Sequence, residues 1–515
     1  MMNDVLERVK KNRSFFLGMF FILLGLFLFS HNSPFYVFNE DFDVNIDLMA
    51  GRLVANGQVP YKDYSSHRGP CSFLYTAICA ATGRGYLALF ALECLSVGIS
   101  FYFMRKTSKM LFGEHHDFMI MTLFYAWMFS NSFAFGGKCE EIFVFVPFFA
   151  LWTMVKYEKE RKTHDFMTLF FLNGILSGFI FCVKFTFTGV YVGLCIALFL
   201  YGIKDGTIKQ SMKQILVFLL GMSLVPLCCV IWAAVNGVLK EMWNAYILLN
   251  IFSYDGKGMS DPLILRIFRN FGNYLKPSGR DQWNSLMFLN VLSVLYWMFA
   301  VTYQIIKKKK DSKFRLCVMI LSVFNLLPIL IGNSYSYYQT ITLPFGMIAT
   351  VTFLNEITKK ENVRNFITIA VFCIMAMFLL MSDRLIYSVL YQENNAWVFE
   401  FAKEMNKDSD KTLLNIYMES PLGNYIKELP GCEDFCFLNA GAEKIKLNQI
   451  KYIQEKLTNY ILVYRELDEE KRGTLFVDNK YTDPDLFENY ELIKTGKTHL
   501  YDERACQVEL WKRKQ

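Results

Sequence analysis

Residues 166–201 read FMTLFFLNGILSGFIFCVKFTFTGVYVGLCIALFLY, and this stretch decides the class of fold. It contains two apolar runs separated by a single charged residue, Lys184. A helix that crosses a lipid bilayer needs roughly 20 mainly apolar residues, and fewer where neighbouring helices or local thinning of the bilayer help. The stretch therefore predicts two membrane spans, at 166–183 and 185–203, on either side of Lys184.

The composition of the whole chain is that of a membrane protein. Of 515 residues, 53% are hydrophobic, 17% are aromatic and 20% are charged, which is more apolar surface than a water-soluble fold of this size buries. This excludes disorder and argues against a simple cytosolic enzyme. Residues 1–382 carry a net charge of +12 and residues 383–515 a net charge of −5. Because the basic excess lies between apolar segments, nucleic acid is not expected as a partner.

Eleven segments have the length and composition expected of membrane spans. They lie near residues 15–30, 85–104, 117–135, 141–155, 166–183, 185–203, 214–236, 284–306, 316–332, 339–354 and 366–382. Alternate connections between them hold 23 of the 35 Lys and Arg side chains of residues 1–382. Cytoplasmic loops carry such an excess, so the N-terminus is predicted in the cytoplasm and the C-terminal part outside. No small-residue cleavage site follows the first span, which is interpreted as a retained anchor.

These segments predict a polytopic α-helical membrane domain over residues 1–385 and a small extracytoplasmic α/β domain over residues 386–515. In the second domain, apolar runs at 412–417, 460–464 and 490–493 alternate with helix-like stretches at 397–406, 421–428 and 447–457. The last run, 507–512, alternates as an edge strand does. Cys432 and Cys436 are close enough in sequence to pair, but the cysteines show no spacing typical of a metal site.

The connection after the first predicted span is rich in charge. Residues 39–43 read NEDFD, which places the carboxylates of Glu40, Asp41 and Asp43 within four positions. Like charges this close repel one another unless cations or a metal ion compensate them, so the loop predicts a site for a charged ligand. An acidic loop that is merely solvated is the alternative. Residues 59–70 (VPYKDYSSHRGP) follow, and Arg68 there would lie at the depth of the phosphate headgroups.

A second acidic pair stands at the mouth of the fourth predicted span. Residues 136–147 read GGKCEEIFVFVP, with Glu140 and Glu141 adjacent. Negative charge is favoured at a helix N-terminus, so capping is a serious alternative to a binding role. Capping explains one acidic residue more easily than two that point in different directions.

Lys184 and an aromatic turn complete the set of outer features. An ammonium group at membrane depth should face a partner or water, so Lys184 either binds a phosphate or extends to the outer headgroups. Tyr337 lies in the turn 333–338 (NSYSYY), which an interfacial aromatic belt explains as well as sugar stacking does. Glu93 is a further acid within a span and is expected to hydrogen-bond between helices.

Taken in order, these motifs resemble those of GT-C-type membrane glycosyltransferases. The most similar group is the family of the protein O-mannosyltransferases and the aminoarabinose transferases of lipid A. The resemblance covers about residues 10–385 and rests on VPYKD followed by HRGP, on EEIF running into PFF, and on Lys184 after a glycine-containing span. It implies transfer of a sugar from a polyprenyl-phosphate carrier to an acceptor hydroxyl or similar group on the outer side of the membrane.

The resemblance also implies roles for single residues. The family's catalytic carboxylate in the first outer loop corresponds best to Asp41, with Glu40 and Asp43 as rivals. The second acidic position corresponds to Glu140, with Glu141 adjacent. Asp41 would then be the base, and Glu140 would orient the acceptor or bind a metal ion.

The remaining residues of the predicted site would contact substrate. They are Glu40, Asp43, Tyr61, Asp63, His67, Arg68, Glu141, Lys184 and Tyr337. Lys184 and Arg68 would bind the donor phosphate, although Arg68 stands where many relatives have lysine. Displacement from the opposite face of the sugar ring predicts inversion at the anomeric carbon through an oxocarbenium-like transition state. A divalent cation is compatible with this chemistry, but no spacing demands one and no other cofactor is expected.

The expected partners are the polyprenyl-phosphate sugar, a glycan, lipid or protein acceptor, and the bilayer. Two other classes stay open. A lipid-linked oligosaccharide flippase or other transporter would favour repeated halves and charges at the membrane midplane, and the sequence shows no internal repeat. A surface-polysaccharide polymerase or ligase would use arginines of a large outer loop, and Arg266, Arg269 and Arg280 keep that alternative open.

Overall fold

The structure is a computed structural model, and it describes residues 13–252, 262–275, 313–381, 396–416, 421–425, 449–466, 484–499 and 505–514, apart from 65, 131, 134, 333–334 and 359. The residues fall into two compact units. Unit 1 is formed by Met1–Phe35, Phe90–Cys229 and Ser260–Ser382, and unit 2 by Tyr36–Leu89, Val230–Met259 and Asp383–Gln515. Each unit thus collects segments that are distant in the sequence. The division predicted at residue 385 stays a prediction.

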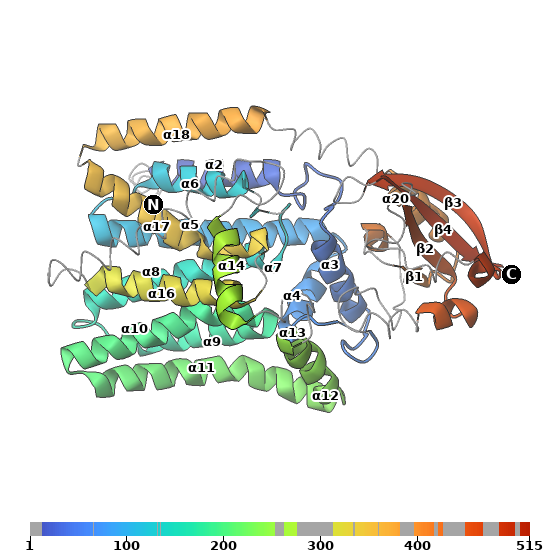
Figure 1. The fold of residues 1–515 in the computed structure, drawn as a ribbon, viewed down its shortest axis with the longest axis horizontal. Coiled ribbons are helices and arrows are strands. Elements are labelled where there is room, and N and C mark those ends of the chain that lie inside the picture. Colours follow the sequence, from blue (N-terminus) through green and yellow to red (C-terminus); the bar gives the residue numbers. More distant parts are fainter. Residues whose placement is uncertain are drawn as a thin grey trace, which may run out of the picture. The chain divides into compact units, whose positions relative to one another are not determined.

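Unit 1 consists of helices (Figure 1). They are α2 (Arg13–Phe29), α5 (Gly85–Phe112, from Phe90 on), α6 (Asp117–Met128), α7 (Cys139–Ile142), α8 (Phe145–Glu160), α9 (Met167–Val183), η1 (Phe185–Thr188), α10 (Gly189–Asp205), α11 (Ile208–Val235, up to Cys229), α14 (Leu263–Leu275), α16 (Lys313–Ile331), η4 (Ser336–Thr342), α17 (Leu343–Ile357) and α18 (Glu361–Met381).

Glycines allow some of these helices to approach closely. A Cβ atom at Gly189 in α10 would lie 2.2 Å from the carbonyl oxygen of Phe324 in α16. One at Gly174 in α9 would lie 2.1 Å from the carbonyl oxygen of Phe218 in α11. Association of helices in lipid depends on such close backbone contact. These glycines therefore allow α10 to lie close beside α16 and α9 close beside α11, as can be followed in Figure 1.

Three helices are long and apolar enough to cross a membrane, judged by length and composition over the described residues: Gly85–Phe112, Phe185–Asp205 and Ile208–Val235. Only 11% of an 18-residue apolar window of Ile208–Val235 is buried within the described part of the chain, as expected of a helix that faces lipid. The chain is a membrane protein. Helices lie at ten of the eleven predicted span positions, and 284–306 lies outside the described residues. The number of crossings and the orientation of the termini stay predictions.

Unit 2 combines short helices with one sheet. Its helices are α3 (Phe42–Ala55), α4 (Pro70–Ala81), α12 (Leu239–Met242), η2 (Trp243–Leu248), α13 (Leu249–Phe252), α20 (Trp397–Met405), η5 (Pro421–Tyr425) and η8 (Pro484–Phe487). Gly51 in α3 allows α3 and α4 to pack closely, because it has no Cβ atom. A Cβ atom at this position would lie 2.3 Å from the backbone carbon of Thr76 in α4.

The sheet contains β1 (Leu413–Asn415), β2 (Tyr460–Glu466), β3 (Tyr490–His499) and β4 (Ala505–Arg513) in the order β1-β2-β4-β3. Strands β1 and β2 are parallel, and the other pairs are antiparallel. Alternate residues of β2 face different cores: Leu462 packs with Phe401, whereas Val463 packs with Phe487. The small C-terminal sheet confirms the predicted mixture of strands and helices there. The prediction that 507–512 forms an edge strand was wrong, because β4 pairs with β2 on one side and β3 on the other.

Candidate functional site

A tight turn before α7 positions the acidic pair of unit 1. Gly136 has φ of 81° and Gly137 has φ of 91°, values that favour glycine. A Cβ atom at Gly136 would lie 2.4 Å from Oγ of Ser30 and 2.6 Å from Oε1 of Glu93. Glu93 is fully buried, and its carboxylate accepts a hydrogen bond of 2.6 Å from the Ser30 hydroxyl. Glu93 is thus the interhelical partner that the sequence predicts, and it supports the turn.

Glu140 and Glu141 point to different partners, although both are buried. The backbone amide of Lys138 donates to Oε2 of Glu141 at 3.0 Å, so Glu141 caps the start of α7. Glu140 instead forms an ion pair with Lys184, the residue that follows α9. The capping alternative therefore accounts for Glu141, whereas Glu140 is directed at a cation 44 positions away in the sequence.

Lys184 and Lys138 both lie against tyrosine rings of η4. The Nζ atom of Lys184 lies 4.0 Å from the ring centre of Tyr338 and 5.4 Å from that of Tyr337. The Nζ atom of Lys138 lies 3.8 Å from the ring centre of Tyr337. Ammonium groups are attracted to aromatic faces at these distances. We call Lys138, Glu140, Lys184, Tyr337 and Tyr338 the lysine–tyrosine cluster.

Hydrogen bonds from three other helices hold η4 in place. The indole of Trp127 in α6 donates to Oγ1 of Thr340 at 3.0 Å. The amide of Asn325 in α16 donates to the carbonyl of Ile341 at 2.9 Å. The Tyr274 hydroxyl in α14 donates to Oγ1 of Thr342 at 3.0 Å. Buried polar groups with satisfied partners rigidify their surroundings, so the tyrosine rings have a fixed backbone beneath them.

The sequence predicted Glu140, Lys184 and Tyr337 of this cluster but not Lys138 or Tyr338. Both missed residues stand inside the quoted motifs, GGKCEE and NSYSYY. The available signal was the adjacency of Lys138 to two glycines and two acids. That signal does not show that the ammonium groups of Lys138 and Lys184 both lie against tyrosine rings of η4.

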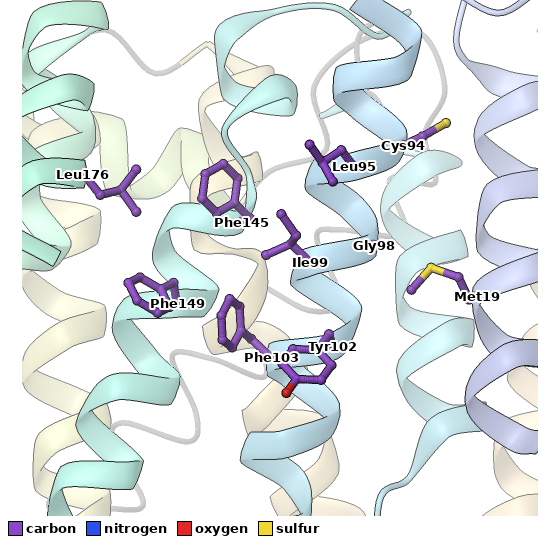
Figure 2. Close-up of a pocket in the computed structure, with 10 residues that line it drawn as sticks. All are labelled: Met19, Cys94, Leu95, Gly98, Ile99, Tyr102, Phe103, Phe145, Phe149 and Leu176. Carbon is purple, nitrogen blue, oxygen red and sulfur yellow. The ribbon is translucent and has the colours of Figure 1, made fainter. Parts of the chain in front are cut away.

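A pocket of about 600 Å³ opens in unit 1, lined by side chains of α2, α5, α8 and α9. Figure 2 shows Ile99 and Phe103 of α5 on the side facing Phe145 and Phe149 of α8. The other lining residues are Met19, Cys94, Leu95, Gly98, Tyr102 and Leu176. The lining is almost entirely apolar, so an apolar group would fill this pocket. Its α8 wall begins at Phe145, shortly after Glu140 in α7.

The acidic loop of unit 2 is ordered by its own side chains. Asp41 is 6% exposed and caps α3, with Oδ1 accepting from the amide of Val44 at 3.2 Å. Its own amide donates to Oδ1 of Asn39 at 2.8 Å. The loop is therefore not merely solvated. Asp41, Asp43 and Arg68 belong to unit 2, whereas Glu140, Lys184 and Tyr337 belong to unit 1.

Arg68 bridges two acids on successive turns of α3. Its Nη2 atom lies 2.7 Å from Oδ1 of Asp43, and its Nε atom lies 2.8 Å from Oδ1 of Asp47. A guanidinium group suits two carboxylates because its donors point in fixed directions. The like-charge repulsion that the sequence predicts is thus compensated in part by Arg68. Asp47 is not among the residues predicted for the site from the sequence.

The other residues predicted in this loop make hydrogen bonds that involve its backbone. The Tyr61 hydroxyl donates to the carbonyl of Arg68 at 2.6 Å. Oδ2 of Asp63 accepts from the amide of Val59 at 2.7 Å. The carbonyl of His67 accepts from the side-chain amide of Asn250 at 2.8 Å. These contacts shape the loop, and substrate-binding roles for Tyr61, Asp63 and His67 stay predictions.

Glu40 differs from its neighbours. Its Oε1 atom is buried and has no hydrogen-bond partner in the part of the chain that the structure describes. Burial raises the pKa of its carboxyl from 4.5 to about 9. Glu40 is therefore protonated at neutral pH, which suits a hydrogen-bond donor better than a base.

Replacing Glu40 by glutamine is expected to raise the melting temperature at about pH 8 and to change it little at about pH 4. The folded state retains the Glu40 proton where the unfolded chain has lost it, because the pKa rises from 4.5 to about 9 on folding. Stability therefore falls as the pH rises through this interval, and glutamine removes that dependence. Thermal unfolding in detergent across the interval measures the effect. Equal pH slopes for both proteins would contradict it.

A family model described as the N-terminal domain of the putative competence-induced protein Ccs4 matches residues 4–390. The chain belongs to this family. All predicted site residues of this Ccs4-family chain, from Glu40 to Tyr337, lie within the match, whereas β1 to β4 lie beyond it. No curated protein matches the chain.

Two solved structures of the Archaeoglobus fulgidus oligosaccharyltransferase are similar to the Ccs4-family chain. The complex with Zn and sulfate is 12% identical over 87% of this chain and 67% of the other, with a TM-score of 0.48. The form tethered by a disulfide bond to an acceptor peptide containing the NVT sequon is 14% identical over 98% of this chain and 74% of the other, with a TM-score of 0.46. At this identity the similarity assigns no residue, donor or acceptor to this chain.

Arg266 and Arg269, on which the polymerase or ligase alternative rests, lie on α14. This helix runs across α16 (Figure 1), and its Asn270 donates to the carbonyls of Leu330 and Gly332 at 3.0 and 2.7 Å. Arg280, Cys432 and Cys436 lie outside the described residues. The hydrogen bonds of Asn270 explain the position of α14 and do not bear on that alternative.

Proposed function

We propose that this chain transfers a sugar from a polyprenyl-phosphate carrier to an acceptor at the outer face of the membrane. The acceptor would be a glycan, a lipid or a protein of the cell envelope. The observation that carries the proposal is the lysine–tyrosine cluster, where two ammonium groups and a buried carboxylate lie beside aromatic rings. A sugar phosphomonoester needs cations for its phosphate and a carboxylate for the incoming hydroxyl.

Lys184 is the first candidate for holding the donor phosphate. Its partner Glu140 is 2% exposed, whereas Lys184 is 18% exposed, so the ammonium group is the more accessible member of the pair. A phosphate would share Lys184 with Glu140 through charge-assisted hydrogen bonds. Lys138, which lies against Tyr337 in the same cluster, is proposed as a further cation for the phosphate beside Arg68.

Asp41 is proposed as the base that takes the proton of the acceptor hydroxyl, and Glu140 as the group that orients the acceptor. The assignment of Asp41 rests on the order of motifs in the sequence. Glu40 and Asp43 stay rivals, although the raised pKa of Glu40 makes it the poorest base of the three. Where a divalent cation takes part, Glu140 is the carboxylate of the cluster that would hold it, with the ion replacing Lys184 as its partner. The reaction proceeds with inversion at the anomeric carbon.

The test is transfer by purified protein in liposomes that contain a polyprenyl-phosphate sugar labelled in the sugar. Cell-envelope extract supplies the acceptors, and the readout is label that moves from the lipid to the acceptor fraction. Protein with Lys184→Met should lose transfer, whereas Lys159→Met, at an exposed lysine of α8, should keep it. Labelled donor that crosses the bilayer without losing its sugar would favour a flippase. Label that stays on the lipid carrier in the presence of the wild-type protein would reject the proposal.

We also propose that the apolar tail of the donor enters the pocket of unit 1. A tail of isoprene units is the part of this donor that an almost entirely apolar wall accepts, and burial of each methylene contributes about 0.8 kcal/mol. The pocket is bounded by α8, which follows α7 after two residues, and by α9, whose last residue, Val183, precedes Lys184. Glu140 and Lys184 of the cluster are thus close in the chain to two of the helices that line the pocket.

Gly98→Phe is expected to raise the KM for a long-chain donor about tenfold, because its ring would displace roughly two methylene groups from the pocket. Gly98→Ala is the matched control, since a Cβ atom there meets only Met19, at 3.4 and 3.5 Å, which is ordinary contact. Initial rates against donor concentration measure both variants. A short-chain donor should be used equally well by all three proteins. An unchanged KM for the long-chain donor in Gly98→Phe would show that the tail does not bind in this pocket.

A further inference from the structure

A short segment of the C-terminal part reaches the acidic loop within unit 2. The segment is η5, residues Pro421–Tyr425. The carbonyl of Gly423 accepts from the guanidinium group of Arg52 in α3. The Tyr425 hydroxyl donates to the carbonyl of Val37 at 2.7 Å. These contacts join residues more than 350 positions apart in the sequence.

Asn424 continues this contact through two side chains. Its Nδ2 atom donates to the Tyr86 hydroxyl at 3.0 Å and lies 3.5 Å from Oδ1 of Asn45. The Tyr86 hydroxyl in turn donates to the same Oδ1 at 2.6 Å. The donors and acceptors are consistent with one another, so the three side chains form a single ordered network.

Asn45 carries the network into the acidic loop. It is 1% exposed, and its Nδ2 atom donates to the carbonyls of Asn39 and Asp41 at 3.0 and 2.9 Å. Both N–H donors of the Asn45 side chain therefore bind backbone carbonyls, one on each side of Glu40. The Tyr86 hydroxyl donates to the oxygen of the same amide, so it further stabilises the orientation in which the NH2 group faces the two backbone carbonyls.

We propose that Asn424, acting through Tyr86 and Asn45, is a positioning residue for the loop 39–41. The C-terminal part would then set the geometry of the acids rather than only cover them. What the loop does rests on the proposed function, whereas the control of its geometry does not. Aromatic contacts support the same placement: the rings of Phe399 and Tyr425 lie 5.0 Å apart, and those of Phe38 and Phe399 lie 6.0 Å apart.

The experiment measures backbone hydrogen exchange at residues 39–45 in the full-length protein. Asn424→Ala should raise exchange there about fivefold to tenfold, the ratio expected for the loss of one buried hydrogen bond. Tyr86→Phe, which removes one oxygen atom and should fold, is the second variant and should have a similar effect. Asn459→Ala is the matched control, because its buried amide donates to the carbonyl of Asp410 at 2.7 Å, away from the loop.

Transfer kinetics give a second readout that a general loss of stability would not reproduce. In Asn424→Ala, kcat should fall by about the same factor while the KM for the donor stays unchanged, and Asn459→Ala should change neither. Unchanged exchange in both Asn424→Ala and Tyr86→Phe would overturn the inference, whatever the protein transfers. Raised exchange together with an inactive wild-type protein would uphold the inference and reject the proposed function.

Discussion

Replacing Lys184 by methionine is expected to lower the free energy of unfolding by about 3 kcal/mol. Methionine fills a similar volume but removes the ammonium group, which leaves the carboxylate of Glu140, 2% exposed, without its ion-pair partner. Breaking a buried pair costs about 3 to 5 kcal/mol, and the partial exposure of Lys184 places this one at the lower end. Chemical unfolding in detergent measures the change.

The double variant Glu140→Gln with Lys184→Met is the control for this prediction. It leaves no buried charge without a partner, so most of the lost stability should return. Lys159→Met, at an exposed position of α8, should change stability by no more than about 0.5 kcal/mol. If the single and double variants lose the same stability, the ion pair is not what Lys184 contributes.

Replacing Asp41 by asparagine is expected to reduce sugar transfer at least about 100-fold, the lower bound for loss of a general base. Asparagine caps helices as well as aspartate does, so the contact with the Val44 amide and the start of α3 should survive. The change thus removes the charge of Asp41 and little else. Initial rates of transfer, with melting temperature recorded alongside, measure it.

Asp165→Asn is the matched control for this prediction. Asp165 is exposed, and its side chain accepts from the amide of Met167 at the start of α9. Like Asp41, it therefore accepts a hydrogen bond from a backbone amide at the start of a helix. Transfer should be unaffected by Asp165→Asn. Undiminished transfer by Asp41→Asn would show that another group, with Asp43 the first to test, is the base.

The helices of unit 1 could be predicted because their signal is local. Each apolar run, such as that on either side of Lys184, must satisfy its own backbone hydrogen bonds in lipid, and a helix does so without partners from elsewhere. The break at Lys184 is equally local, since α9 ends one residue before it. The pairing of Lys184 with Glu140 is not local, and the sequence suggested it only through the requirement that a buried charge have a partner.

The misassigned strand shows the opposite case. Residues 507–512 alternate as a strand with one exposed face does, but alternation reports on the faces of a strand and not on its edges. Glu509 looks solvent-facing in the sequence, yet it is 4% exposed, and Arg465 and Trp511 both donate to it. Whether a strand has neighbours on both sides depends on segments that are distant in the chain, here β2 and β3.

Arg68 shows the same limit within the predicted site. The sequence placed it near headgroup phosphates, but its ion pairs are with Asp43 and Asp47. The two acids stand one helical turn apart, a spacing at which side chains share a face. That spacing was visible in the sequence, but the approach of Arg68 to that face depends on how α3 and α4 pack.

The network through Asn424 has a consequence for biosynthesis. Asn45 and Asn424 are separated by 379 positions in the sequence. Because a ribosome adds about 5 to 20 residues per second, Asn424 is synthesised roughly 20 to 80 seconds after Asn45. During that interval the loop 39–41 of the nascent chain lacks the hydrogen bond that Asn424 donates to Tyr86. Ribosome-bound chains that end before residue 421 are therefore expected to show fast backbone hydrogen exchange and ready proteolysis near residue 40. Chaperones that bind this segment would act before residue 421 is synthesised.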